Sequence, residues 1–327
     1  MAEYKAIRGH TIRTIDGDAS PLIAGDIWYN SSAKKIKGVK LAAGSWATGG
    51  ELNTARYSLG GAQNSTQTAG LVFGGQTSST NRQATCEEYD GSSWTESGDL
   101  ADARTAIAGA GIQTAALAMG GDSPGYPTAT ELYDGSSWST SPVTLGYGKD
   151  NGASFGTQTA TIFATGYKSG GETDEVELFN GSSWTEVGKV NSKRSYVDGC
   201  GTSTAGIIAA GSAPPYTGVA ETWDGTSWTE VADLNTARAN FSIFGVQTSA
   251  VGSGGDDGST PRYTSCEYWD GTSWTEVADI TGARKMAQSV GTTTAGLMAA
   301  GSNPSNNGMN TSEEWSQSTA AVTFTSS

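Results

Sequence analysis

One cassette is written six times along this chain of 327 residues. Its clearest copy, E-T-W-D-G-T-S-W-T-E-V-A-D-L-N-T-A-R, runs from Glu221 to Arg238. The second tryptophan of the cassette recurs every 44 to 48 residues, at Trp46, Trp94, Trp138, Trp184, Trp228 and Trp274. A regular period in this range is typical of a β-propeller, in which each repeat forms one four-stranded blade. The sequence therefore predicts an all-β, six-bladed propeller.

Each repeat reads as four short strands with almost no helical periodicity. An Asp-Gly pair joins the third strand to the fourth, as in Tyr133-Asp134-Gly135, and is among the strongest short hairpin signals. The first two strands are rich in Gly and Ala, and the chain holds 46 glycines. Small residues let neighbouring blades approach closely near the axis. We therefore expect the first strands to be innermost and the aromatic residues to fill the space further out.

The two ends of the repeat array complement each other. The first unit, around Trp46, is a fourth strand with no preceding three, and the last unit, from Arg284 to Trp315, lacks a fourth strand. We expect the N-terminal strand to complete the last blade, which removes two open sheet edges. The predicted domains are an arm over 1–41, a propeller over 42–317 and a C-terminal tail over 318–327.

An acid and a base recur with the repeat. The acids precede the third-strand aromatic by two residues, at Glu87, Glu131, Glu177, Glu221, Glu267 and Glu313. The bases begin the first strand, at Arg56, Arg104, Arg194, Arg238 and Arg284, with Lys149 in the third repeat. A catalytic acid is needed once and not six times, so we interpret these residues as structural ion pairs.

The chain carries few residues suited to metal or triad chemistry. His10 is the only histidine and lies outside the repeats, which argues against a Ser-His-Asp triad or a histidine-rich copper site in the propeller. No zinc-ligand spacing occurs. Three cysteines, Cys86, Cys200 and Cys266, cannot all pair, and we expect free buried thiols in a protein folded in a reducing cytoplasm. We predict no catalytic residue, no metal and no cofactor.

A glycan-cleaving enzyme remains the rival class. Any two acids at the right separation could act as a glycosidase pair, and the acids outside the repeat pattern are Asp174, Glu175, Asp256 and Asp257. The D-G-S-S-W turn also resembles the Asp-box of sialidases, although that box has one more residue between Asp and Gly. The alternative reading of these four acids is that they are solvated loop residues.

Charge is divided unevenly along the chain. Residues 1–40 hold seven Lys/Arg and four Asp/Glu, whereas the rest holds twelve Lys/Arg and 29 Asp/Glu. An acidic propeller is a poor surface for nucleic acid, because phosphate binding needs clustered basic residues. No apolar stretch approaches ~20 residues, so we expect no membrane insertion, and we expect no secretion signal.

The loops between the second and third strands differ in every repeat and are where recognition is expected. Tyrosines occur in four of them and basic residues in three, giving a predicted ligand-binding set of Arg82, Tyr126, Tyr167, Lys168, Tyr216, Arg262 and Tyr263. Tyrosine offers a flat apolar face and a polar tip, which suits sugars or proteins. The alternative is that each ring packs over its own loop.

The repeat resembles the kelch repeat, with an Arg before the first strand, a double glycine such as Gly120-Gly121 after the second, Glu-x-Tyr-Asp on the third and Trp on the fourth. The turn between the third and fourth strands is tighter than the usual kelch one. The opening M-A-E-Y-K-A-I-R-G-H, the G-D-I-W-Y-N segment from Gly25 to Asn30 and the D-G-T-S-W-T-E-V repeats are similar to kelch-like virion proteins of tailed bacteriophages, particularly marine ones. The resemblance implies a virion component carried on the tail and assembled in the host cytoplasm.

These readings combine into one expectation. The chain is a non-enzymatic virion protein that binds a host surface glycan or protein through propeller loops. The arm reads as a hairpin whose Trp28 and Tyr29 anchor it to other virion proteins or to sister copies, since an isolated hairpin is marginal in water. The alternatives are a purely structural decoration or connector, and the glycan-cleaving enzyme.

Overall fold

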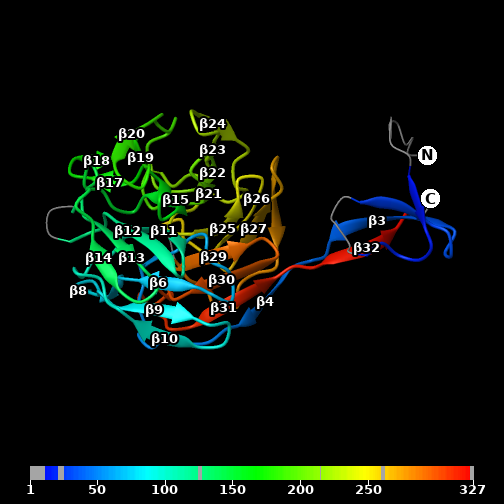
Figure 1. Ribbon diagram of the computed structural model, residues 1–327, viewed down its shortest axis with the longest axis horizontal. Helices are drawn as coiled ribbons and strands as arrows, with labels where there is room; N and C mark the ends of the chain where they lie inside the picture. The colour runs from blue at the N-terminus through cyan, green and yellow to red at the C-terminus, as the bar shows by residue number, and fades with distance from the viewer. Residues whose placement is uncertain (1–11, 21–25, 124–126, 214, 259–261, 325–327) are drawn as a thin grey trace. The chain divides into compact units, whose positions relative to one another are not determined.

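The computed structural model describes residues 12–20, 26–123, 127–213, 215–258 and 262–324, and every regular element within these ranges is a β-strand (Figure 1). No helix within these ranges is long and apolar enough to cross a bilayer. The chain divides into two compact units. We call residues 45–316 the ring, and residues 1–44 together with 317–327 the terminal unit.

The ring contains two short two-stranded sheets, β7 (Gln76–Ser78) with β8 (Asn81–Arg82) and β17 (Tyr167–Lys168) with β18 (Gly171–Glu172), and six four-stranded antiparallel sheets. The first three sheets are β5 (Gly60–Gly61), β6 (Leu71–Phe73), β9 (Cys86–Tyr89) and β10 (Trp94–Ser97); β11 (Ala108–Ile112), β12 (Ala115–Met119), β13 (Thr130–Tyr133) and β14 (Trp138–Thr140); and β15 (Ala153–Thr157), β16 (Ala160–Ala164), β19 (Val176–Phe179) and β20 (Trp184–Glu186). The other three are β21 (Asp198–Thr202), β22 (Ala205–Ala209), β23 (Ala220–Trp223) and β24 (Trp228–Val231); β25 (Ser242–Val246), β26 (Ser249–Ser253), β27 (Cys266–Trp269) and β28 (Trp274–Val277); and β29 (Gln288–Thr292), β30 (Ala295–Ala299), β31 (Ser312–Ser316) and β4 (Ser45–Thr48).

The sixth sheet joins the two ends of the repeat array. Strand β4 pairs antiparallel with β31, and Trp46 lies opposite Trp315. The predicted completion of the last repeat by the N-terminal strand is confirmed. The pairing covers the edge that β31 would otherwise leave open, and β4 becomes the outer strand of this sheet.

A closed cycle of backbone hydrogen bonds joins the six sheets at their inner ends. Its members are the residues two positions after each buried base, Ser58, Ala106, Asn151, Tyr196, Asn240 and Met286. Each N–H donates to the carbonyl oxygen of the equivalent residue in the preceding sheet over 2.8–3.2 Å, and Ser58 closes the cycle on Met286. All six have positive φ, between 50° and 57°. That conformation is uncommon for residues other than glycine, and here six hydrogen bonds hold it in place.

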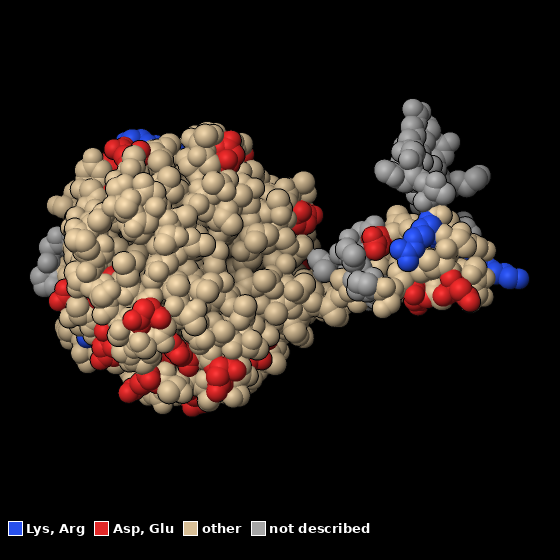
Figure 2. Space-filling model, in the orientation of Figure 1, with Lys and Arg blue, Asp and Glu red and all other residues tan. Residues whose placement is uncertain are grey.

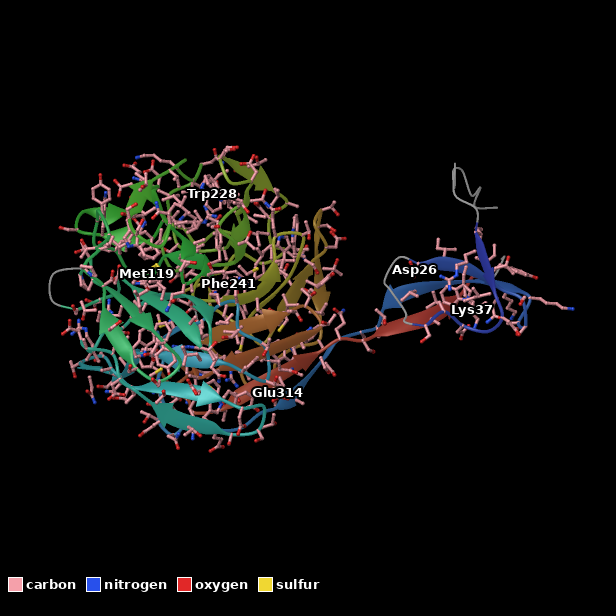
Figure 3. All side chains as sticks on the ribbon, in the orientation of Figure 1. Asp26, Lys37, Met119, Trp228, Phe241 and Glu314 are labelled. Carbon is pink, nitrogen blue, oxygen red and sulfur yellow. The ribbon has the colours of Figure 1, made fainter. Side chains whose placement is uncertain are left out.

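An aromatic pair spans the two outer strands of every sheet. The ring centroids are 4.9–5.4 Å apart in the pairs Tyr89–Trp94, Tyr133–Trp138, Phe179–Trp184, Trp223–Trp228, Trp269–Trp274 and Trp46–Trp315. Such pairs add to the burial of the rings themselves. Met119, Trp228 and Phe241, labelled in Figure 3, belong to three of the apolar clusters that fill the ring.

Glycines let neighbouring sheets approach each other. A Cβ on Gly206 would lie 2.2 Å from the Phe155 ring of the third sheet, and one on Gly296 would lie 2.2 Å from the Phe244 ring of the fifth. These distances are too short for any side chain. The glycine-rich inner strands therefore follow from close packing between sheets, as the sequence predicts.

Each recurrent base lies against the recurrent acid of its own sheet. The arginines approach the glutamates in the pairs Arg56–Glu87, Arg104–Glu131, Arg194–Glu221, Arg238–Glu267 and Arg284–Glu313, and all ten side chains are almost fully buried. Each acid also accepts a backbone N–H from the segment that enters its sheet, for example from Asn235 to Glu267 over 2.7 Å. The pairs therefore tie the entering segment to the third strand.

The third sheet holds its pair more loosely. Lys149 Nζ lies 3.8 Å from Glu177 Oε2 and donates to the carbonyl oxygens of Phe163 and Glu175 over 3.0 and 3.2 Å. Burial lowers the pKa of Lys149 to about 8 and raises the pKa of Glu177. An ammonium group lacks the forked donors with which arginine meets a carboxylate.

The terminal unit corrects two predictions. Residues Thr319–Thr323 are not a tail but strand β32, and the expected hairpin is part of a four-stranded sheet in the order β1 (Arg13–Ile15), β2 (Ile27–Asn30), β3 (Lys35–Leu41), β32. Trp28 is only 2% exposed and donates from Nε1 to the Gly17 carbonyl oxygen over 3.3 Å. Trp28 is therefore a core residue of this unit and not an exposed anchor. An isolated hairpin would leave the Trp28 side chain in water, whereas the four-stranded unit buries it.

Candidate functional site

One face of the ring carries the variable loops. In every sheet, the residue after the buried base forms a β-bridge with the first residue of the loop between the second and third strands, in the pairs Tyr57–Gln76, Thr105–Asp122, Asp150–Tyr167, Ser195–Ser212, Ala239–Asp256 and Lys285–Ser302. We call this face the loop face. Its loops begin beside the axis, so residues from all six sheets converge there.

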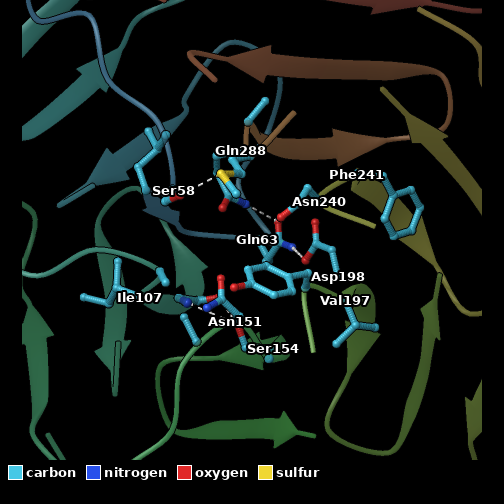
Figure 4. A pocket seen from close by; sticks show the side chains of 18 residues that line it. Ser58, Gln63, Ile107, Asn151, Ser154, Val197, Asp198, Asn240, Phe241 and Gln288 are labelled. Atoms are coloured by element: carbon cyan, nitrogen blue, oxygen red, sulfur yellow. Dashed lines mark hydrogen bonds between the residues drawn. The ribbon is translucent and has the colours of Figure 1, made fainter. Parts of the chain in front are cut away.

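A pocket lies at the centre of the loop face and is lined by all six sheets (Figure 4). We call it the axial pocket. Its rim is the hydrogen-bonded cycle from Ser58 to Met286, and Gln63, Ser154, Asp198 and Gln288 lie deeper. The cavity volume of about 80 Å³ is enough for several water molecules or one small polar group.

An insertion in the first repeat crosses the axis. Tyr57 and Gln67 are ten residues apart, whereas the equivalent Thr105 and Gln113 are eight apart. The extra residues bring Gln63 and Asn64 from the first sheet to the fourth sheet on the opposite side of the ring. Gln63 Nε2 donates to Asp198 Oδ1 and to the Gly199 carbonyl oxygen, each over 3.0 Å. The insertion thereby supplies part of the pocket floor.

Asp198 is the only charged side chain among the eighteen residues that line the axial pocket. Its carboxylate accepts hydrogen bonds from Gln63 Nε2, from its neighbour Gly199 N and from Ile243 N, over 2.8–3.0 Å. All three donors are neutral. Burial raises the pKa of Asp198 to about 7, while these donors act in the opposite direction.

A second acid lies beside the pocket. Asp150 is 6% exposed and accepts a hydrogen bond from Asn151 Nδ2 over 2.9 Å. Burial raises its pKa to about 6, and the nearby charge of Asp122 acts in the same direction. The equivalent position of the sixth sheet holds Lys285, which forms an ion pair with Asp256 in the fifth sheet's loop.

The basic residues of the predicted ligand-binding set are engaged within the protein. Arg82 reaches from the first sheet to Asp122 of the second, with Nη2 2.9 Å from Oδ2. Arg262 is 5% exposed and donates to Asn306 Oδ1 in the sixth sheet over 2.6 Å. Lys168 pairs with Glu175 at 2.7 Å and lies 4.9 Å from the centre of the Tyr147 ring. These contacts brace the loops.

The predicted tyrosines differ in how far they pack against the protein. Tyr216 lines a small surface hollow with Asp257 and packs on Gly258, where a Cβ would lie 2.6 Å from its ring. Tyr263 lies 5.1 Å from the Arg238 guanidinium. Tyr167 keeps 36% of its surface exposed, whereas Tyr126 lies outside the described residues. Packing over loops, the alternative reading, holds for Tyr216 and Tyr263.

Sequence reasoning missed the residues of the axial pocket. Asp198, Tyr196 and Asn151 lie near the starts of inner strands and not in the variable loops on which the prediction was based. Two signals pointed to them. The two-residue insertion marks Gln63, and the position of Asp198 carries an acid in only one of six repeats.

The remaining acids and thiols have structural surroundings. In the Asp-Gly turns, Asp90, Asp224 and Asp270 accept backbone and hydroxyl hydrogen bonds that lower their pKa to about 2. The three cysteines are free and buried, and burial raises the pKa of Cys86 and Cys266 to about 12. Across the described ranges, no group of three or more His, Cys, Asp or Glu is placed to hold a metal ion.

The chain has a structural counterpart among solved structures. The structure of YjhT matches with a TM-score of 0.67 and 13% sequence identity, over 81% of this chain and 96% of that chain. The fold is all-β and β-propeller-like. At this identity the likeness shows the fold alone. No protein-family model matches the chain, and no curated protein matches it.

Proposed function

We propose that the chain is a six-bladed, kelch-like propeller that serves as a non-enzymatic virion protein of a tailed phage. It binds a host surface glycan or protein through the loop face. The observation that carries the binding role is the axial pocket. It is a polar depression, open on the face with the variable loops, and its rim is held by six backbone hydrogen bonds. A binding group on such a scaffold is positioned before the ligand arrives.

Three exposed aromatic rings lie on the loop face, in the third and fourth repeats. Tyr196 is part of the rim and is 36% exposed, and Tyr147 and Tyr167 are 42% and 36% exposed. An exposed tyrosine loses little conformational entropy on binding and offers both apolar and polar contact. Asn151 and Asn240 lie next to Tyr196 on the rim, with their amide nitrogens donating to Asp150 and Asp256. Their amide oxygens supply acceptors suited to hydroxyl groups.

The virion assignment is supported by the N-terminal sequence and by the separate fold of the terminal unit. One face of its sheet carries Ile27, Ile36 and Phe324, each 41–42% exposed, with Tyr29 opposite Ile36 in the register. Exposed apolar side chains together on one sheet face are typical of an interaction surface. We propose that this face, and not Trp28, attaches the protein to a virion neighbour or to sister copies near the tail.

Acidic side chains are spread over the ring in Figure 2. The arginines of the ion pairs add nothing to this surface, because they are buried. Such a surface disfavours nucleic acid as the partner. It is compatible with a glycan or protein ligand that carries neutral or basic groups.

A glycan-cleaving enzyme is the second candidate, and Asp150 is the observation that favours it. Asp150 is buried, its pKa is raised to about 6, and the Asp122 carboxyl lies nearby. A carboxyl in such surroundings has the character of a general acid. The pure protein incubated with host polysaccharide would then release oligosaccharides, and Asp150→Asn would abolish the release. We expect no release from either protein.

Binding of the labelled full chain to intact host cells tests the proposed function. We expect the double variant Tyr167→Ser, Tyr196→Ser to weaken cell binding at least ~tenfold, as expected for aromatic contacts at an interface. The matched control is Ile112→Ser with Val246→Ser, two exposed apolar residues at the inner-strand turns away from the loop face. Equal loss in both double variants, or no binding by the unmodified chain, contradicts the proposal. Mass spectrometry of purified particles tests the virion assignment separately.

A further inference from the structure

We infer that the axial pocket binds a positively charged amine of the ligand, with the Asp198 carboxylate as its counter-ion. This inference rests on the proposed binding role of the loop face and names the chemistry of the ligand. The amine belongs to an amino sugar or to a lysine side chain, and both present the same ammonium group.

The first support is that Asp198 is not required by the repeat. The equivalent positions of the other five sheets hold Gly60, Ala108, Ala153, Ser242 and Gln288. Those sheets fold with small or neutral side chains at this depth. The ion-pair acids recur in every sheet because the fold needs them, whereas this acid occurs once. The repeat therefore does not account for a carboxylate at this position.

The second support is the missing countercharge. No Lys, Arg or His of the described residues forms an ion pair with Asp198. The elements packed around it contribute Ser154, Ser242 and Gln288, which are neutral, and the buried thiol of Cys200. Its raised pKa follows from this surrounding. A carboxylate removed from water without a cation is costly, and an ammonium group would relieve that cost.

The third support is the access to the carboxylate. Asp198 retains partial exposure although its sheet neighbours Val197 and Gly199 are buried, and Asp198 lines the open pocket. Gln63 and its donor Gln288, whose Nε2 lies 2.8 Å from Gln63 Oε1, fix the floor on one side. The Tyr196 ring at the rim can contact an ammonium group through its face. The pocket therefore admits a small cation and leaves the rest of the ligand on the loop face.

Ethanolamine and ethylene glycol are matched probes for this inference, since they differ in charge and little in size. Titrated into the full chain at about pH 8.5, ethanolamine should perturb the NMR signals of Asp198 and Gly199 and bind at least ~tenfold tighter than ethylene glycol. Asp198→Asn should abolish the difference in affinity between ethanolamine and ethylene glycol. Asp233→Asn, the same change at an exposed position following the fourth sheet, should leave it unchanged.

A pH series covers the case in which Asp198→Asn does not fold. Ethanolamine stays charged between about pH 5.5 and 8.5, so a change in its affinity reports the protein. Its affinity should fall ~tenfold per pH unit below the Asp198 pKa of about 7, where the carboxyl takes up a proton. Equal affinity for the two probes, an affinity that ignores pH, or equal competition by sodium at the same concentration overturns the inference.

The outcomes separate the two proposals. Ethanolamine binding without cell binding contradicts the proposed function and leaves the amine pocket standing. Cell binding that is unaffected by Asp198→Asn, together with equal probe affinities, leaves the proposed function standing and removes the amine as the recognised group.

Discussion

Gln63 of the first sheet donates a hydrogen bond across the axis to Asp198 of the fourth sheet, over 3.0 Å. The two residues come from opposite sides of the ring and meet beneath the rim of the axial pocket (Figure 4). Asn64 follows the same path and donates to the Gly201 carbonyl oxygen over 3.2 Å. The sixfold repetition is therefore broken at the axis, and it is broken beside Asp198, the one charged residue that lines the axial pocket.

Replacing Gln63 by Ala should raise the pKa of Asp198 further. The substitution removes one of the donors that favour its ionised form, so the carboxylate becomes harder to form. We expect a loss of about 1–2 kcal/mol in the free energy of unfolding, the usual range for one buried hydrogen-bond partner. Carbon-detected NMR titration of the Asp198 carboxyl checks the direction, and a pKa that falls in Gln63→Ala would contradict it.

Asp198 should also make stability depend on pH in a defined direction. Its pKa is raised from 3.8 to about 7 by folding, so the folded state holds the proton more tightly than the unfolded state. The contribution is complete below about pH 4 and is lost as the pH rises through 7, with a limiting slope of about 1.4 kcal/mol per pH unit. Denaturant unfolding of the unmodified chain and of Asp198→Asn should show this difference. A stability of the unmodified chain that rises with pH relative to that of Asp198→Asn would exclude an uncompensated carboxylate.

Breaking one buried ion pair should be costly. Arg238→Met leaves the Glu267 carboxylate buried with only the neutral donors of Asn235 and Thr236, and we expect a loss of about 3–5 kcal/mol in the free energy of unfolding. The control is Glu276→Gln, an exposed residue opposite Glu267 in the register, whose loss should stay within about 0.5 kcal/mol. Thermal or denaturant unfolding measures both. Similar small losses would show that the pairs contribute little to stability.

Substitutions in the terminal unit should separate folding from attachment. Trp28→Ala empties a buried site and should unfold this unit, at a cost of about 3–5 kcal/mol, while the ring melts as before. Ile36→Ser with Phe324→Ser changes exposed residues and should keep the unit folded but prevent incorporation into particles. Hydrogen exchange and particle composition are the measurements. Normal incorporation of the second variant would remove this face as the attachment surface.

The repeat-level features could be predicted because they occur six times. The Arg238–Glu267 type of pair and the glycine-rich inner strands follow from a pattern that every repeat shows. The Trp46–Trp315 pairing follows from the complementary ends of the repeat array. The terminal unit could not be predicted in this way. The strand that completes it, β32, lies at the other end of the chain from Trp28, so no local pattern indicates that Trp28 is buried.

The site escaped prediction for a related reason. The partner of Arg82 is Asp122, and the partner of Arg262 is Asn306, each in the loop of a neighbouring sheet. The variable loops share no repeated sequence pattern, so contacts between neighbouring loops cannot be predicted by comparing the repeats. The insertion at Gln63 is visible in the sequence, but its destination is Asp198, 135 residues away, which only the closed ring brings near.

Retention of host polysaccharide by the pure chain, with the polymer length followed by size-exclusion chromatography, tests the central claim most directly. The binding account predicts that polymers bearing free amines are retained and recovered at full length, and that Asp198→Asn loses most of this retention. Release of shortened products that stops in Asp150→Asn would contradict the account and make the loop face an active site.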